Sequence, residues 1–533
     1  MKLLSFGWLS LMVSTAAWAQ LGEEPAIKEH VDQSAIDAGD VHLDDLIEAG
    51  RLLFEARFKR LDGQGRPAST GAGVPRAPDE PAFIRTSGPD SNSCTGCHAQ
   101  PRPGGAGDFV ANVFVLAQTL DPVISSVDAM FSDERNTLGM MGAGPIEMLA
   151  RELSQELIAI REQATAEAAQ TGRPVTRSLT AKGIGFGSIT VLPDGKVDPS
   201  QIEGVDWDLI VKPFHQKGAV VSLREFTNNA MNHHHGMQSV ERFGEGVDAD
   251  GDSVVDELTV GDITAVTVFQ AALNTPGQVI TRSFEGAIAD GERLFGTIGC
   301  AKCHVPTLTL NDRRFTEPNP FHPTGNLHVE DVPQVLSFDL TVDGPKPRLE
   351  PSGSGGALVR AFTDLKRHDL NDDEFNHFDN EQIPQGMING SAPAAEFTIA
   401  PFPRPTAQFL TRKLWNVGNT APYGHRGDLT TLTEAINFHG GEARTSRDAF
   451  FTLPQADQDK VIGLVKSLQI APDGSDLVLF ANADGTLETS GTPTPGGTRL
   501  CGAIGAVPLM SMGSFLGFLR SSGRRALSRR GER

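Results

Sequence analysis

The sequence predicts a mainly α-helical protein. It should contain two domains of one kind, a helical and loop-rich insertion, and little β-structure. Two observations predict the paired domains: the motif Cys-x-x-Cys-His occurs at 94–98 and again at 300–304, and a Gly-x-x-Leu-Phe pattern precedes each copy, in EAGRLLF (48–54) and DGERLFG (290–296). A third observation, the helical character of 147–170, predicts the helix of the insertion.

Length and charge set the outer bounds. A chain of 533 residues is too long for one compact core. Its net charge of −21 argues against nucleic acid as a partner and fits a solvated acidic surface.

Both ends of the chain carry segments that are typical of export. Residues 1–19 are predicted to be a signal peptide, because Lys2 precedes an apolar run that ends in Ala17-Trp18-Ala19. This run is short for a membrane anchor. We therefore expect an exported protein, periplasmic or on the surface of a Gram-negative-type bacterium.

At the other end, 476–500 is predicted to be a linker. Residues 501–533 combine an apolar stretch with a cluster of arginines, which indicates a C-terminal sorting tag or membrane anchor rather than an ordinary amphipathic tail. Contact with a membrane is expected only through this segment.

Four of the five cysteines lie in the two repeated motifs. Two disulfides would be another use of four cysteines in an exported chain. However, a histidine follows each pair directly, and Cys-x-x-Cys-His is the attachment signal of c-type haem. Its thiols bind the porphyrin and its histidine ligates the iron. The sequence therefore predicts two covalent haem c groups. The attachment residues are Cys94, Cys97, Cys300 and Cys303, and the proximal ligands are His98 and His304.

The repeat defines two cytochrome c-like domains, at 36–282 with the insertion and at 283–475. A small hairpin is expected within 180–200, where β-branched residues flank Asp194-Gly195. The C-terminal helix of the second domain should begin at Pro454. Its expected core face consists of Val461, Leu464, Val465 and Leu468.

Longer stretches show a resemblance to a known family. LWNVGNTAPYGHRGDLTTLTEAINFHGGEA (414–443) resembles the C-terminal signature of the bacterial di-haem cytochrome c peroxidase superfamily. Its HGGEA ending and three other stretches resemble the di-haem oxidoreductase branch, and these are NHHHGMQSVERFG (232–244), GDITAVTVFQAALNTPG (261–277) and FTDLKRHDL (362–370). The resemblance implies that one haem meets a small oxidant. The other haem relays electrons from a donor protein such as a small cytochrome or cupredoxin.

The resemblance also implies axial ligands. Peroxidases of this superfamily have a distal Met on the second haem, and the matching position here is His439, which suggests His304/His439 ligation. A bis-His haem has a lower potential than a His/Met haem, and this weakens the case for ordinary peroxide reduction. The alternative is that His439 is a loop residue at a helix end.

On the first haem, no histidine occurs between His98 and His215, so the sixth position is open or filled from a distance. His233, His234 and His235 are the candidates, although such a run also fits a metal site or a polar loop.

One carboxylate is a candidate catalytic group. GAGPIEML (142–149) resembles the peroxidase stretch that carries a distal Glu, which makes Glu147 the expected proton-transfer residue. The alternative is a charge placed favourably near a helix N-terminus.

Two calcium sites are candidates. The resemblance implies an ion held by the carbonyls of Thr420 and Pro422. Separately, DADGDSVVDE (248–257) spaces oxygen ligands as calcium prefers, but Thr259 stands where a full EF-hand loop has Glu. The acidic ligand candidates are Asp248, Asp250, Asp252 and Asp256. A solvated acidic turn is the alternative.

Trp415 is the candidate electron relay between the haems, with a core Trp as the alternative. The function that we expect is an exported di-haem c oxidoreductase that reduces peroxide or a related small oxidant. The rivals are a non-catalytic di-haem electron carrier and a haem oxygenase that acts on an organic or protein substrate.

Overall fold

The structure is a computed structural model. The residues that it describes are 24–65, 91–107, 110–112, 134–353, 355–374, 408–482, 484 and 486–489. The expected signal peptide and the expected sorting tag lie outside these residues. Within them, no helix combines the length and the hydropathy that a bilayer-spanning segment needs.

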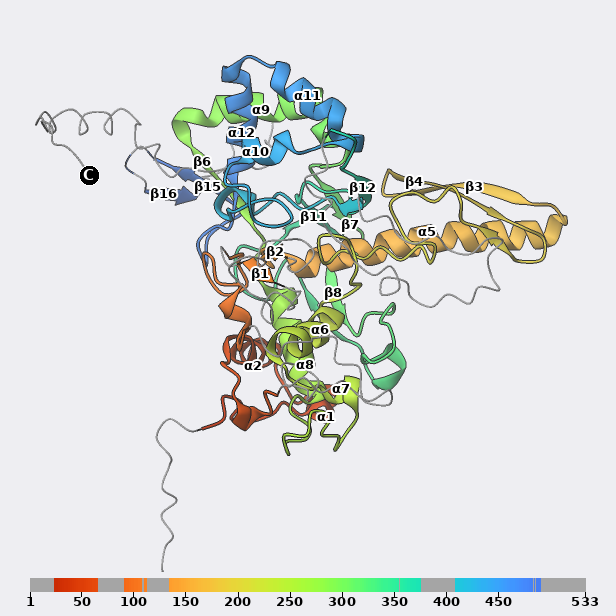
Figure 1. The fold of residues 1–533 in the computed structure, drawn as a ribbon, viewed down its shortest axis with the longest axis vertical. Coiled ribbons are helices and arrows are strands. Elements are labelled where there is room, and N and C mark those ends of the chain that lie inside the picture. Colours follow the sequence, from red (N-terminus) through yellow and green to blue (C-terminus); the bar gives the residue numbers. More distant parts are fainter. Residues whose placement is uncertain are drawn as a thin grey trace, which may run out of the picture.

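Two crossed helix pairs lie at opposite ends of the molecule (Figure 1). At one end α2 (Leu43–Glu55) packs on α8 (Val260–Ala272), and at the other α9 (Glu285–Thr297) packs on α12 (Gln455–Ser467). A Cβ on Gly50 would lie 2.0 Å from the Ala265 carbonyl oxygen, and one on Gly291 would lie 2.1 Å from that of Lys460. Only glycine allows backbones to approach so closely. The Gly-x-x-Leu-Phe repeat therefore marks the place where each pair of helices crosses.

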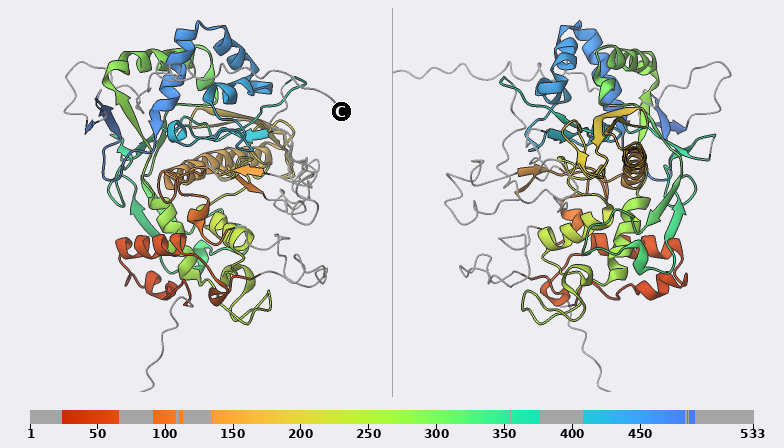
Figure 2. Two further views of the ribbon diagram at one scale, coloured as in Figure 1. Left: turned by 60° about the vertical axis from the view of Figure 1, so that its left-hand side comes forward. Right: turned by 90° about the vertical axis from the view of Figure 1, so that its right-hand side faces the viewer.

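The remaining helices gather around these pairs. The α2–α8 end also contains α1 (Gln33–Asp37), α6 (Leu223–His235) and α7 (Val240–Phe243), and the other end contains α10 (Leu432–Asn437) and α11 (Arg444–Thr452). The α5 helix (Ala143–Thr171) crosses between the two ends and projects from the body as an arm (Figures 1 and 2). It confirms the helix predicted over 147–170. The core face predicted for the C-terminal helix of the second domain is also confirmed, because Val461, Leu464 and Val465 of α12, and Leu468 directly after it, are buried.

Short strands form six sheets among the described residues. The pairs are β1 (Val110–Asn112) with β2 (Glu134–Asn136), β8 (Arg314–Glu317) with β9 (Leu336–Asp339), and β12 (Arg367–Asp369) with β13 (Gln408–Leu410). One three-stranded sheet has the order β10 (Glu350–Pro351), β11 (Ala357–Val359), β7 (Leu308–Leu310). A second three-stranded sheet lies on the arm and has the order β3 (Val175–Ala181), β4 (Ile184–Val191), β5 (Val197–Asp198). The longest sheet has the order β14 (Leu468–Gln469), β6 (Gly277–Thr281), β15 (Val478–Ala481), β16 (Leu487–Thr489). Its β15 and β16 lie inside the range suggested as a linker.

The expected fold class was wrong in one respect. Among the described residues 37% are helical and 16% are in strands, so this is a mixed α and β structure rather than a mainly α one with little β. The hairpin predicted near Asp194-Gly195 is confirmed as β4–β5. Apart from β3 and β4, the described strands are two to five residues long, and several have distant partners, such as β6 with β15. Local periodicity carries no signal for such pairs.

Two main apolar clusters fill the interior. The first joins α2, α5 and α8 with Leu308, Leu310 and Phe315 from the second half of the chain. The second lies around Phe295 and α12. Trp415 belongs to the first cluster, whereas its neighbours Leu414 and Val417 pack on the second. The segment around Trp415 therefore connects the two.

Candidate functional site

The first Cys-x-x-Cys-His motif lines a cavity of about 470 Å³. Its cysteines lie at the short helix η2 (Cys94–Gly96), and the second motif begins in the same way at η4 (Cys300–Lys302). No disulfide joins the cysteines of the two motifs in the described part of the chain, so the disulfide alternative is not formed. Burial, with a smaller effect of the charge of Cys97, raises the pKa of Cys94 to about 12.

The histidines of the two motifs are held alike. The Nδ1 atom of His98 lies 3.3 Å from the Gly105 carbonyl oxygen, and that of His304 lies 3.0 Å from the Phe362 carbonyl oxygen. A carbonyl only accepts, so each Nδ1 carries the hydrogen and each Nε2 presents a lone pair. Burial lowers the pKa of both histidines to about 4. Each is therefore a neutral imidazole, the form that ligates iron.

These residues fit a haem at the first motif. Paired thiols provide the attachment points, and a neutral imidazole with an oriented Nε2 provides the axial donor. The cavity volume lies within the range of about 300–1,000 Å³ that cofactor and ligand sites occupy. The donor set of the second motif is the same, and Cys300 packs against the second apolar cluster.

The three consecutive histidines occupy the last turn of α6 and separate there. His234 and His235 line the first cavity, and His233 is not among the residues that line it. His235 is held by the Ser91 carbonyl oxygen at 2.9 Å from Nδ1, with Nε2 3.4 Å from the Cys94 sulfur. Burial is the main cause of the lowered pKa of His98, and the charge of His234 adds to it, whereas the hydrogen bond with Gly105 opposes both. Of the three histidines, His234 is therefore the best placed to act on the distal side of the first haem.

His439 is brought together with His304. Its charge is, after burial, the main cause of the lowered pKa of His304. Its Nδ1 lies 2.7 Å from the Ala435 carbonyl oxygen, the same backbone restraint that holds the two motif histidines. Burial lowers the pKa of His439 as well. The arrangement is consistent with the expected axial pair.

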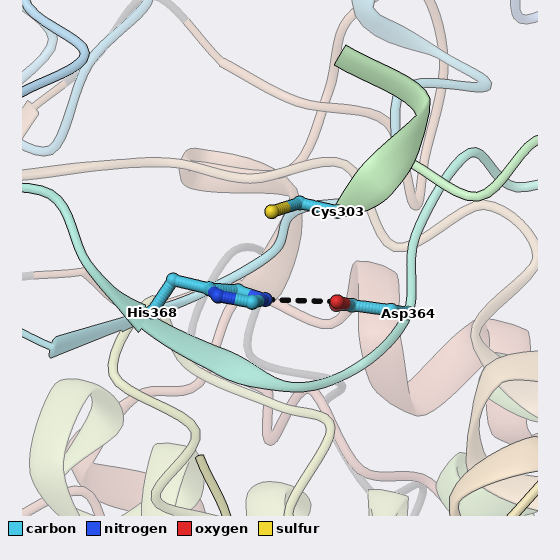
Figure 3. A group of neighbouring side chains, drawn as sticks. All are labelled: Cys303, Asp364 and His368. Atoms are coloured by element: carbon cyan, nitrogen blue, oxygen red, sulfur yellow. Dashed lines mark hydrogen bonds and ion pairs between the residues drawn. The ribbon is translucent and has the colours of Figure 1, made fainter. Parts of the chain in front are cut away.

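A charged group that sequence reasoning missed borders the second motif. Figure 3 shows the Cys303 sulfur beside His368 and Asp364, with ligand atoms of all three within 4.8 Å. His368 donates from Nε2 to Asp364 at 2.8 Å and from Nδ1 to Glu442 at 2.7 Å. Burial opposes the charge, but these bonds and one with Cys303 raise the pKa of His368 to about 11. With both nitrogens protonated, the ring is a cationic donor and not a metal ligand.

The only signal for this group lay in two of the stretches that carry the resemblance. His368 belongs to FTDLKRHDL and Glu442 to the HGGEA ending. The tertiary structure joins these stretches through one histidine ring.

Glu147 lies away from the first cavity. It is fully buried and is not among the cavity-lining residues. Its carboxylate accepts hydrogen bonds from Arg151, from Asn319 Nδ2 at 2.9 Å and from the Leu223 backbone at 2.8 Å. The neighbouring Ile146 lines the cavity instead, because consecutive helical residues point in different directions. Glu147 is therefore an ion-pair residue of the interior, and its backbone partner Leu223 lines the cavity.

The acidic loop gathers three of its four candidate ligands. Oxygen atoms of Asp248, Asp250 and Asp252 lie within 4.8 Å of one another, whereas Asp256 accepts from the Gly246 backbone at 2.7 Å. One oxygen of Asp250 and one of Asp252 are buried without a partner. Burial and the nearby charge of Asp252 raise the pKa of Asp250 to about 6.

At the other candidate calcium position, Asn136 is a partner that the sequence did not indicate. Its Nδ2 donates to the Pro422 carbonyl oxygen at 2.9 Å, and its Oδ1 is buried without a partner. Thr420 is near in sequence, and its hydroxyl donates to the Asn416 carbonyl oxygen at 2.9 Å.

Trp415 is almost fully buried, at 1% exposure, and its Nε1 has no partner in the described structure. The Lys413 ammonium lies 5.9 Å from the centre of its ring. Because Lys413 lines the first cavity, Trp415 stands directly behind the cavity wall.

A comparison with protein families gives a match for part of the chain. Residues 401–468 match the family model described as "Di-haem oxidoreductase, putative peroxidase". The match confirms the resemblance to di-haem oxidoreductases and supports an oxidoreductase with haem as its cofactor. The matched segment supplies His439 to the second site, and Arg412, Lys413 and His425 to the first cavity.

The comparison with curated proteins found no match. Among solved structures, hydrazine synthase of Kuenenia stuttgartiensis, pressurised with 20 bar xenon, is similar with a TM-score of 0.32 and 14% identity. The alignment covers 87% of this chain and 100% of that one. A score this low carries no argument about this chain.

Proposed function

We propose that this chain is an exported di-haem c oxidoreductase, periplasmic or on the cell surface, that reduces peroxide or a related small oxidant at its first haem. The observation that carries the proposal is the cavity at the first motif. Cys94, Cys97 and His98 share it with basic and imidazole side chains. The second motif brings His439 close to His304. One site is therefore suited to an exogenous molecule and the other to electron relay.

Different residues of the chain have different roles at the first haem. Cys94 and Cys97 would attach the first haem, and Nε2 of His98 would ligate it. When bound, the haem supplies the redox centre at which an O–O bond is reductively cleaved. With Glu147 outside the cavity, the imidazoles of His215, His234 and His425 are the described cavity-lining groups suited to move a proton.

Electrons would enter through the second haem, attached by Cys300 and Cys303 and ligated by His304 and His439. The donor would be a small external cytochrome or cupredoxin. Trp415 is the proposed relay between the two sites, supported by its burial and by its place where the two apolar clusters meet.

A second function is favoured by one observation. His234 lines the same cavity as His98. If it ligates the first iron permanently, both haems are six-coordinate and the protein is an electron carrier.

Electron paramagnetic resonance of the oxidised holoprotein separates the two functions. The oxidoreductase is expected to show a high-spin ferric signal from the first haem and rapid oxidation by hydrogen peroxide. Two low-spin signals together with no reaction would establish the carrier. His234→Ala is the informative variant, because it should convert a carrier spectrum into a high-spin one and leave an already open site high-spin.

We further propose calcium at two positions. The first lies among Asp248, Asp250 and Asp252, where unpartnered carboxylate oxygens are buried. The second lies at the Thr420 and Pro422 carbonyls, where a flipped Asn136 amide would add its unpartnered Oδ1. Carboxylate, amide and carbonyl oxygens are the ligands that calcium prefers.

Removal of calcium should lower thermal stability. An ion present at about 100 times its dissociation constant contributes about 2.7 kcal/mol, so EGTA should lower the Tm by several degrees. Asp250→Asn should remove part of this calcium-dependent shift, and Asn136→Ala should remove another part. Asp194→Asn, in the distant hairpin turn, is the control. A Tm that is indifferent to EGTA in the native protein would rule out both sites.

A further inference from the structure

The first cavity is basic although the chain is acidic. The whole sequence has 67 acidic and 46 basic residues. Yet the described cavity-lining residues include no Asp or Glu, and they include four cations. These are Arg135, Lys217, Arg412 and Lys413. A positively charged cavity wall in a negatively charged protein indicates a preference for anionic ligands.

Two of these cations have no acidic partner in the described structure. Arg412 donates to the His215 carbonyl oxygen at 3.3 Å, and Lys413 donates to the Met141 carbonyl oxygen at 2.7 Å. Burial lowers the pKa of Arg412 to about 10 and holds that of Lys413 well below its usual range. Burial disfavours a charge that has no counterion, and an anion beside these groups would offset that cost.

A third cation extends the same wall. Lys217 is 7% exposed, and its ammonium lies 3.6 Å from the centre of the Phe409 ring. Phe409 and Leu410 lie in the same segment as Arg412 and Lys413, separated from them by Thr411, and Leu410 also lines the cavity. The segment 409–413 therefore carries Arg412 and Lys413 and contacts Lys217 through the Phe409 ring.

We propose that Arg412 and Lys413 form an anion site in the wall of the first cavity, suited to a carboxylate or another small oxyanion. The proposal rests on the proposed function and adds the charge class of the molecule that the site accepts. Two sources share this chemistry: the propionates of the haem itself and a free anionic substrate.

The test uses holoprotein and the variants Arg412→Gln and Lys413→Met. Azide is the anionic probe and imidazole the neutral one, each titrated against the visible spectrum of the first haem, whose midpoint potential is also measured. Lys366→Gln is the matched control, because Lys366 is also partly buried but already pairs with Glu203 at 3.2 Å, outside the cavity. Lys413→Arg keeps the charge and checks that an effect is electrostatic.

For a free-anion site, azide affinity should fall about tenfold in each charge-removing variant while imidazole affinity stays within about twofold. For a propionate site, both affinities should stay unchanged and the midpoint potential should fall, because nearby cations favour the reduced haem. Either result supports the anion site and identifies its source. If affinities and potential all match the control variant, the anion site is overturned.

These outcomes are distinct from failure of the proposed function. If neither azide nor imidazole binds the wild-type first haem, the open oxidoreductase site is wrong. The midpoint potentials then still decide whether the two cations meet an anion.

Discussion

Replacing Cys94 and Cys97 together by serine is expected to abolish covalent haem attachment at the first site and to reduce peroxide turnover by about two orders of magnitude or more. Serine hydroxyls cannot form thioethers, so His98 alone would have to retain the porphyrin in the cavity. The residues of a catalytic unit act together, and loss of its redox centre removes the contribution of the whole unit.

The measurement is the mass of the intact denatured chain, with haem staining after denaturing electrophoresis. The variant should carry one covalent haem fewer than the native protein. The matched variant, with Cys300 and Cys303 replaced by serine, should also lose one haem but keep the spectrum of the first. Replacement of Cys501 should change neither the number of covalent haems nor the spectrum of the first haem. A double-serine variant that still carries two covalent haems would contradict the attachment sites.

The largest effect on stability is expected from Arg224→Met. Arg224 is fully buried and donates to Glu241 at 2.7 Å and to Glu317 at 3.0 Å, within the network that also contains Glu147. Removing one partner of a buried ion pair leaves an uncompensated charge, at a cost of about 3–5 kcal/mol. The free energy of unfolding from denaturant titration measures this. Arg293→Met, at an exposed ion pair, is the control and should cost about 1 kcal/mol or less.

The loss in free energy of unfolding in Arg224→Met should depend on pH, because it depends on the ionisation of Glu317. Burial raises its pKa above the ordinary value even with Arg224 present, and removal of the arginine raises it further. The unfolded carboxyl ionises near its usual pKa of about 4.3, so the folded state is penalised once the pH exceeds that value. The native protein shares this penalty up to its own folded pKa, so the deficit of the variant should begin to grow when the pH passes that raised pKa and should level off above the still higher folded pKa of the variant. A deficit that is independent of pH would mean that Glu317 finds another partner.

This network also explains where the structure places the candidate catalytic residue Glu147. The sequence placed Glu147 correctly on a helix, but α5 is packed so that Ile146 meets the cavity and Glu147 meets Arg151 and Asn319. Helical periodicity gives relative directions around the axis. Which direction faces a cavity depends on the partners that surround the helix.

What the sequence determined by itself is local. Each attachment motif is complete within five residues, and each helix crossing is marked by a glycine and two apolar residues within five more. The tertiary structure alone decided the rest. It selected His234 and His235 from the run of three histidines, joined His368 to Glu442, and placed Arg412 and Lys413 in the wall of a cavity that begins more than 300 residues earlier in the chain. Contacts between distant segments depend on packing and counter-charge across the whole fold, and no local pattern records them.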